Sequence, residues 1–154
     1  MSESTSTQTI SNPTWTVQLP ADWTSTDDPD TGLYFESGDG SRGMYIATWT
    51  ASPGQALPPR EMAESFLAAD LNKLTHMEEC AWRVLEQRLD CDGQHCIAIL
   101  DSYDQVAECR MTTKILAREG KTVRAVFHDD ACGDLAASRA FFAPLLASLT
   151  FTAP

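Results

Sequence analysis

The chain has no apolar run approaching the roughly 20 residues that a membrane-spanning helix needs. Its first dozen residues, 1–12, are mostly polar and rich in serine and threonine, and they have neither the basic start nor the apolar stretch of a signal peptide. We therefore expect a soluble, cytoplasmic protein that does not insert into a membrane.

Basic residues are scarce in this sequence. The 154 residues include 11 lysines and arginines against 22 aspartates and glutamates, which gives a formal net charge of −11. Such a chain would be repelled by nucleic acid and by anionic membranes, so neither is expected as a partner. A cationic protein partner is permitted, although many proteins are acidic for solubility alone.

Residue sets with the spacing of a metal or phosphate site are also missing. The glycine-rich segment 37–43 is not followed by the Lys-Ser/Thr pair of a phosphate-binding loop. Cys91, His95 and Cys96 form the densest group of potential metal ligands. Adjacent residues of a strand point to opposite faces, however, so His95 and Cys96 cannot converge on one ion. We expect no metal and no cofactor.

Cysteine is present in an odd number, five, so at least one thiol stays unpaired. Because no export signal is seen, all five cysteines are expected to be reduced. Cys80 and Cys109 alternate with polar residues and are predicted to be small core hydrophobes.

Hydrophobic periodicity predicts the structural elements. Trp15, Val17 and Leu19 alternate with polar residues, which indicates a strand that Pro20 ends, and Trp23 is expected to fold back over the strand end. Further strands are expected within 32–35, 44–49, 80–85, 97–100, 109–115 and 123–127, the last four as two sequential hairpins.

Two amphipathic helices complete the prediction, one over about 60–77 and one that Asp134 caps and that ends near Leu149. Residues 1–12 are predicted to be a disordered tail and 13–154 a single domain. The residues predicted to be buried share positions on apolar faces: Trp15, Val17, Leu19, Phe66, Leu71, Leu74, Ile97, Ile99, Phe127, Phe142, Leu145 and Leu149.

Two short motifs carry a resemblance to a known family. The opening strand ends in Leu19-Pro-Ala-Asp-Trp23, and the closing helix ends in Leu146-Ala-Ser-Leu-Thr-Phe151. With the order of elements between them, the chain resembles the Mog1/PsbP-like superfamily, which includes the bacterial DUF1795 proteins. The resemblance implies an α+β fold, an antiparallel sheet of six to seven strands with two main helices, and members that mostly bind other macromolecules.

The resemblance also implies a function. Together with the acidic balance, it favours a non-catalytic protein-binding module, either an immunity protein or a chaperone for a secreted bacterial toxin effector of the type VI kind. The partner would be another protein, with a cationic toxin or effector as the candidate, and self-association is left open as an alternative. Two acidic groups are the candidate partner-binding residues: Asp101, Asp104 and Glu108 around Tyr103, and Asp27, Asp28 and Asp30.

Two alternatives come from other classes of function. The segment from His128 to Cys132 contains an imidazole, carboxylates and a thiol, the ingredients of nucleophilic catalysis, so a small cytosolic enzyme is one alternative. Catalytic groups usually converge from distant elements, and a strand end that leads into an acidic loop is the simpler interpretation of this segment. A structural or stress-related protein is the other alternative.

Overall fold

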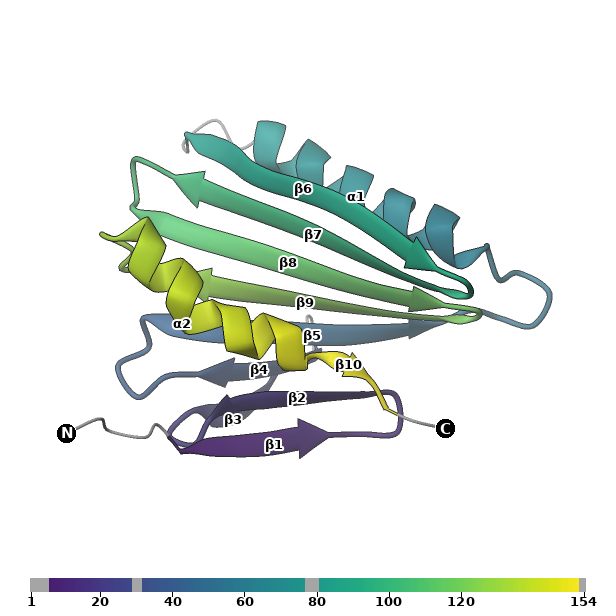
Figure 1. The fold of residues 1–154 in the computed structure, drawn as a ribbon, viewed down its shortest axis with the longest axis horizontal. Helices are drawn as coiled ribbons and strands as arrows, with labels where there is room; N and C mark the ends of the chain where they lie inside the picture. Colours follow the sequence, from purple (N-terminus) through teal and green to yellow (C-terminus); the bar gives the residue numbers. More distant parts are fainter. Residues whose placement is uncertain (1–5, 29–31, 77–80, 153–154) are drawn as a thin grey trace.

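The computed structural model describes residues 6–28, 32–76 and 81–152. At its centre lies a seven-stranded antiparallel sheet in the spatial order β3-β4-β5-β9-β8-β7-β6 (Figure 1). The strands are β3 (Thr24–Asp28), β4 (Gly32–Glu36), β5 (Arg42–Thr50), β6 (Trp82–Asp92), β7 (His95–Asp104), β8 (Cys109–Arg118) and β9 (Lys121–Asp129). The predicted α+β fold is confirmed, and the two sequential hairpins are β6–β7 and β8–β9.

A second, three-stranded sheet consists of β1 (Thr7–Ser11), β2 (Trp15–Pro20) and β10 (Thr150–Phe151), in the order β1-β2-β10. The strand β1 lies within the tail predicted to be disordered, so that prediction is wrong for 7–11. Its side chains are mostly polar, and its backbone pairs with β2 from Thr7↔Pro20 to Ser11↔Thr16. Because a polar strand held by backbone pairing shows no apolar alternation, periodicity does not reveal it.

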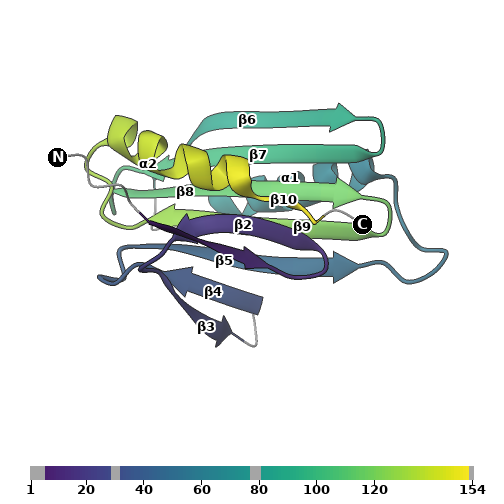
Figure 2. The ribbon, with the colours of Figure 1, turned by 60° about the horizontal axis from the view of Figure 1, so that its bottom comes forward.

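The helix α2 (Leu135–Ser148) and the small sheet cover one face of the large sheet (Figures 1 and 2). The side chain of Asp134 accepts a hydrogen bond from the Ala137 amide at 3.1 Å, which confirms the predicted cap. Aromatic and aliphatic side chains fill the space between these layers: Trp15, Val17, Leu19, Trp23, Phe35, Met44, Ile46, Leu116, Val123, Phe127, Phe142, Leu145 and Leu149.

The other face carries helix α1 (Pro59–Thr75), which lies behind β6, β7 and β8 in Figure 1. Its core is made of smaller side chains: Ala63, Leu67, Leu74, Cys96, Ala98, Leu100, Ile115 and Ala117. Asp70 of α1 accepts hydrogen bonds from Nε and Nη2 of Arg124 on β9, at 3.0 and 2.6 Å. This two-point ion pair fixes the helix against the sheet. In the described part of the chain, no helix is long and apolar enough to cross a membrane.

Nine of the twelve side chains predicted to be buried are buried: Trp15, Val17, Leu19, Leu74, Ile99, Phe127, Phe142, Leu145 and Leu149. Phe66 and Leu71 are partly buried on the flank of the α1 core. The prediction for Ile97 is wrong, because this side chain is 37% exposed. Ile97 lies on the α2 face of β7 near the β6–β7 hairpin, where it lines a surface pocket rather than the core.

The prediction that all cysteines are reduced is wrong for one pair, because Cys91 and Cys96 form a disulfide across the β6–β7 hairpin. A tight turn with Gly93 at φ 59° pairs Cys91 with Cys96 at a Cα separation of 4.1 Å. Antiparallel pairs come this close where no backbone hydrogen bonds join them. Cys109 is partly buried and Cys132 buried, both as free thiols, and Cys80 lies outside the described residues.

Candidate functional site

Three loops meet at one end of the large sheet, on the left of Figure 1. They are the β4–β5 loop (37–41), the β7–β8 turn (105–108) and the β9–α2 loop (130–133). The Asp130 amide donates to the Ser41 carbonyl at 2.7 Å, and the Cys132 amide donates to the Glu108 carbonyl at 2.9 Å. These backbone bonds join the loops into one surface, which we call the loop rim.

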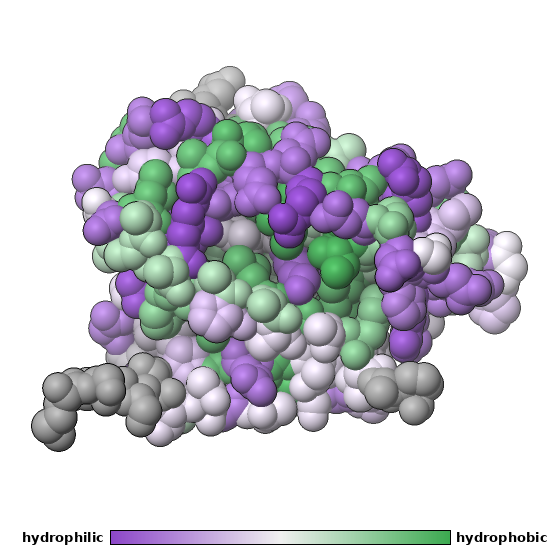
Figure 3. Space-filling model, in the orientation of Figure 1, coloured by the Kyte–Doolittle hydropathy of each residue, from purple (hydrophilic) through white to green (hydrophobic). Residues whose placement is uncertain are grey.

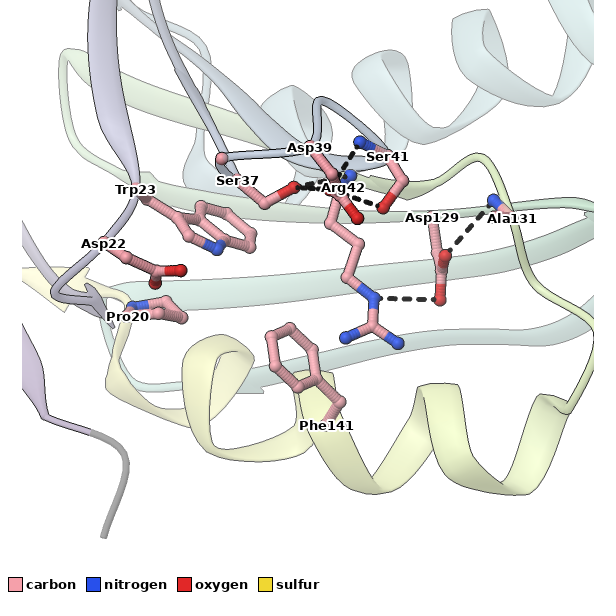
Figure 4. A pocket seen from close by; sticks show the side chains of 11 residues that line it. Pro20, Asp22, Trp23, Ser37, Asp39, Ser41, Arg42, Asp129, Ala131 and Phe141 are labelled. Carbon is pink, nitrogen blue, oxygen red and sulfur yellow. Dashed lines mark hydrogen bonds and ion pairs between the residues drawn. The ribbon is translucent and has the colours of Figure 1, made fainter. Parts of the chain in front are cut away.

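A cleft of about 540 Å³ opens beside the loop rim, between β2, the β4–β5 loop and α2 (Figure 4). Trp23 and Phe141 form its aromatic wall, with ring centroids 6.4 Å apart and stacked. The guanidinium of Arg42 lies over the Phe141 ring at 4.2 Å from its centroid. The Nε atom of Arg42 is 3.5 Å from the buried carboxylate of Asp129. The aromatic wall and the ion pair therefore hold Arg42 in one orientation across the cleft.

The β4–β5 loop is ordered by Asp39 at the cleft wall. One oxygen of this carboxylate accepts hydrogen bonds from the Ser41 amide at 3.0 Å and from the hydroxyls of Ser37 and Ser41 at 2.7 and 2.8 Å. The bond from the Ser41 backbone and the two hydroxyl bonds lower the pKa of Asp39 to about 2. Asp39 is therefore ionised at neutral pH and adds negative charge at the cleft.

The cleft and rim are acidic. Three carboxylates, of Asp22, Asp39 and Asp129, line the cleft against the single guanidinium of Arg42. Exposed acids lie on the loop rim and at its borders, at the same end of the sheet as the cleft. We call these five residues the rim acids: Asp22, Asp39, Glu108, Asp130 and Asp134. Such an arrangement attracts a positively charged group and repels an anion.

The first predicted acidic group is divided by the structure. Asp101 is buried, and its carboxylate accepts two hydrogen bonds from Arg110, at 2.9 and 3.1 Å, and one from Thr112 at 3.0 Å. Asp104 is also buried and accepts from the Ala81 and Val106 amides at 3.1 and 3.0 Å. These two candidate partner-binding acids are therefore not on the surface, because Asp101 is bonded to a buried guanidinium and Asp104 is buried against two backbone amides.

The remaining residues of that group lie nearer the surface. Glu108 is exposed, with φ 52°, in the β7–β8 turn of the loop rim. Tyr103 is partly buried, and its hydroxyl donates to the Cys132 carbonyl at 3.2 Å. Its pKa is raised, mainly by desolvation and then by the nearby Glu108. Tyr103 thus ties β7 to the β9–α2 loop.

The second predicted acidic group lies away from the loop rim. Asp27 and Asp28 belong to β3, the edge strand of the large sheet. Since Thr24 pairs with Glu36 and Asp28 with Gly32, these acids are at the end of β3 opposite the β4–β5 loop. Asp30 lies outside the described residues.

The segment from His128 to Cys132 does not bring a nucleophile to a base. The imidazole of His128 hydrogen-bonds Asp130 through Nδ1 and Tyr34 through Nε2, both at 3.1 Å, on the face of the sheet that carries α1. Cys132 is buried on the other side, near Arg110 and Ser138, and its burial raises the pKa of the thiol. A protonated, buried thiol is a poor nucleophile.

Metal ligands show a similar lack of convergence. Among residues 6–28, 32–76 and 81–152, no group of three or more histidine, cysteine, aspartate or glutamate side chains could hold a metal ion.

A second pocket, of about 320 Å³, lies on the exposed part of the α2 face, over β6, β7 and β8. It is lined by Ile97, Ile99, Leu146 and charged side chains. Figure 3 shows hydrophobic surface between hydrophilic side chains beside α2.

Sequence reasoning missed the main cleft residues. Trp23 was expected to fold back over the strand end, and its ring packs against Phe141 and Phe142. Arg42 comes from the start of strand β5 and Phe141 from helix α2, both distant from Trp23 in the sequence. The available signal was local. Ser37, Asp39 and Ser41 surround two glycines, a pattern typical of a turn that aspartate closes with side-chain bonds.

Comparison with known proteins identifies the fold. No protein-family model matches the chain, and no curated protein matches its sequence. Among solved structures, it is similar to cyanobacterial PsbP (CyanoP) from Synechocystis sp. PCC 6803, with 11% identity over 96% of this chain and 94% of that one, and a TM-score of 0.70.

Two further structures are similar. The Ran-binding protein Mog1p of Saccharomyces cerevisiae is 10% identical over 96% of each chain, with a TM-score of 0.59. A protein from Bacteroides thetaiotaomicron VPI-5482 is 11% identical over 90% of this chain and 45% of its own length, with a TM-score of 0.56. The chain therefore has the Mog1/PsbP-like fold that its two motifs predicted.

Proposed function

We propose that this chain is a non-catalytic protein-binding module whose partner is a basic protein. The observation that carries the proposal is the acidic cleft beside the loop rim, where fixed carboxylates and an aromatic wall surround a hollow of about 540 Å³. A preformed cleft loses little freedom when it binds. The formal net charge of −11 extends the same attraction over a longer range.

The state of the free thiols supports a binding role over a catalytic one. Burial, and then a hydrogen bond to Asp130, raises the pKa of Cys109 to about 12, and burial also raises that of Cys132. Neither thiol is activated for attack at neutral pH. The small-enzyme alternative would need a nucleophile that these groups do not provide.

Among protein-binding modules, we propose an immunity protein or a chaperone that pairs with a secreted toxin effector. We propose that it uses no cofactor. Mog1p, which has a similar fold, is a Ran-binding protein, and this supports a protein partner for the present chain. An immunity protein that blocks a basic toxin would use the acidic cleft.

A chaperone would depend more on apolar surface, and one observation favours that variant. Trp49 and Leu57 are 43% and 46% exposed, and with Met62 they border an apolar pocket of about 220 Å³ at the opposite end of β5. Exposed aromatic side chains beside a pocket are typical binding anchors. The two variants of the proposal therefore use different ends of the molecule.

The test starts from capture of a protein on the immobilised chain, followed by its separate purification and calorimetric titration. We expect one-to-one binding that Asp22→Lys weakens, because it reverses a charge at the cleft mouth. Glu61→Lys, which makes the same charge change on an exposed position of α1, is the matched control and should bind almost as the wild type does. Trp49→Ala reports on the apolar pocket.

Three outcomes discriminate. A larger loss for Asp22→Lys supports the acidic cleft and the immunity variant. A larger loss for Trp49→Ala supports the chaperone variant. Equal binding by all three variants, or the absence of any protein that binds the purified chain, contradicts the proposed module.

A further inference from the structure

Three rings form a cluster on the α1 face of the large sheet, at the end that carries the loop rim. Tyr34 of β4 and Tyr45 of β5 are direct cross-strand partners, stacked with centroids 4.3 Å apart and planes 24° apart. The imidazole of His128 on β9 lies 5.8 Å from the Tyr34 ring and 10° from parallel with it. We call Tyr34, Tyr45 and His128 the ring platform.

The ring platform depends on one glycine. Gly43 of β5 pairs with His128 of β9, and the next strand on its other side is β4, which carries Tyr34. A Cβ atom at Gly43 would lie 2.6 Å from His128 Nε2 and 2.8 Å from the Tyr34 hydroxyl. With no side chain there, Tyr34 Oη and His128 Nε2 meet across the strand at 3.1 Å. A glycine inside a strand commonly marks such a close approach.

The tyrosines of the platform keep exposed surface. The helix α1 packs behind β6, β7 and β8, so the same face of β4 and β5 extends beyond it (Figure 1). Tyr34 and Tyr45 are accordingly only partly buried, whereas His128 beneath them is 8% exposed. Three strands thus hold nearly parallel rings in place, with part of their surface open.

Carboxylates border the open rings. The side chain of Asp130 is 52% exposed, and its Oδ1 lies 3.1 Å from His128 Nδ1, within hydrogen-bond distance. Glu36 follows Tyr34 by two residues on β4, so the two side chains lie on the same face of the sheet. The pKa of Tyr34 is raised, first by desolvation and then by Tyr45, Glu36 and Asp130. Aromatic rings beside ionised carboxylates attract a cation through the ring quadrupole and through direct charge.

We propose that the ring platform binds an arginine side chain of the basic protein partner, stacked on the tyrosine rings and paired with Glu36 or Asp130. This inference rests on the proposed function and names one chemical group that the partner must present. The two supporting observations are the order of the rings across β4, β5 and β9 and the complementary charge of the carboxylates beside them.

Arginine fits the platform better than lysine because its guanidinium is planar. It can stack on a ring while its N–H groups donate to a carboxylate in the ring's border. The same protein makes this contact internally, where Arg42 lies over Phe141 at 4.2 Å and Arg118 over Phe151 at 4.6 Å. On the ring platform, the guanidinium would come from the partner.

The test uses the whole chain and a blocked glycine peptide with one central arginine. Nuclear magnetic resonance titration should shift the ring protons of Tyr34 and Tyr45 and the amides of β4 and β5. A peptide with citrulline, which has the shape of arginine without the charge, should cause much smaller shifts. Tyr45→Leu should raise the dissociation constant about two- to fivefold, as expected for the loss of an exposed cation–π contact.

Matched variants separate the ring and charge effects from misfolding. Tyr45→Phe retains the ring and should bind like the wild type, whereas Glu36→Gln should weaken binding. Each variant must show the wild-type amide pattern outside β4, β5 and β9. If a variant departs from it, the comparison between the arginine and citrulline peptides on the wild-type chain decides alone.

The proposal is overturned if the arginine peptide causes no shifts at the platform, if citrulline causes equal shifts, or if folded Tyr45→Leu binds as well as Tyr45→Phe. Failure of the proposed function gives a different result. A captured partner that binds the wild type and Tyr45→Leu equally leaves the binding module in place and removes only the platform. If no partner protein is found, the proposed function fails, and the shifts caused by the arginine peptide alone still decide whether the ring platform binds arginine.

Discussion

The two faces of the large sheet are covered to different extents. On the α2 face, the helix, the small sheet and large aromatic side chains enclose a core that runs from Trp15 to Phe142. On the α1 face, one helix covers β6 to β8 over small side chains such as Ala63 and Ala98. The rest of that face presents Tyr34 and Tyr45. The comparison indicates that one face provides most of the stability, while the other leaves surface free for binding.

The largest expected effect compares the two cores directly. Phe142 contacts the rings of Trp23, Phe127 and Phe141, so Phe142→Ala should lower the free energy of unfolding by about 3–5 kcal/mol. Leu67→Ala in the α1 core should cost about 2–3 kcal/mol. Urea denaturation measures both. A larger loss for Leu67→Ala would reverse the comparison between the faces.

The second prediction compares one buried ion pair from each face. Asp101→Ala leaves the guanidinium of Arg110 buried without its carboxylate partner, and should cost about 3–4 kcal/mol. Asp70→Ala frees Arg124, whose side chain is 24% exposed and can be solvated, so about 1–2 kcal/mol is expected. Thermal and urea unfolding of both variants test the ranking. Equal losses would show that exposure does not set the cost here.

The third prediction concerns the C-terminal end of α2. Nζ of Lys114 donates to the carbonyls of Leu146 and Leu149 at 2.6 and 2.9 Å, so Lys114→Met should cost about 2 kcal/mol at pH 7. Desolvation, with a smaller contribution from Arg88, lowers the pKa of Lys114 from 10.5 to about 8.

The sign of the pH effect follows from that lowered pKa. Between about pH 8 and 10.5 the unfolded chain binds more protons at Lys114 than the folded chain does, so this group adds stability as the pH rises. The difference in unfolding free energy between wild type and Lys114→Met should grow by about 1–2 kcal/mol from pH 7.5 to 9.5. A difference that shrinks over this range would contradict the lowered pKa.

The smallest effect concerns the two free thiols, one toward each face, and involves no loss of stability. Because burial raises the pKa of both Cys109 and Cys132, each should react with a disulfide reagent at pH 7.5 at least about tenfold more slowly than free cysteine. Single serine variants assign the two rates. A fast reaction at Cys132 would favour the enzyme alternative.

Apolar periodicity made much of the fold predictable. The alternation of Trp15, Val17 and Leu19, the stripe of Phe142, Leu145 and Leu149, and the cap at Asp134 all reflect local physical rules that the tertiary structure obeys. The strand β1 was missed because polar residues carry no such signal. The disulfide was missed because it depends on the register of one hairpin.

The candidate site was less predictable, because charge alone does not reveal burial. Asp101 and Glu108 have the same charge in the sequence, yet Asp101 is buried by Arg110 on the neighbouring strand and Glu108 is exposed in a turn. The cleft and the ring platform each join residues from several strands and loops. Gly43 was a usable local signal, and its meaning became clear only with Tyr34 and His128 on the adjacent strands.

The central claim is that charge guides this chain to a basic protein, and stopped-flow association with the captured partner tests it most directly. Between about 20 and 150 mM salt, the association rate constant should fall by roughly tenfold or more, while the dissociation rate constant changes little, because screening acts on the long-range approach. Asp22→Lys should lower the association rate more than Glu61→Lys does. Association that is independent of salt and equal for both variants would contradict the account.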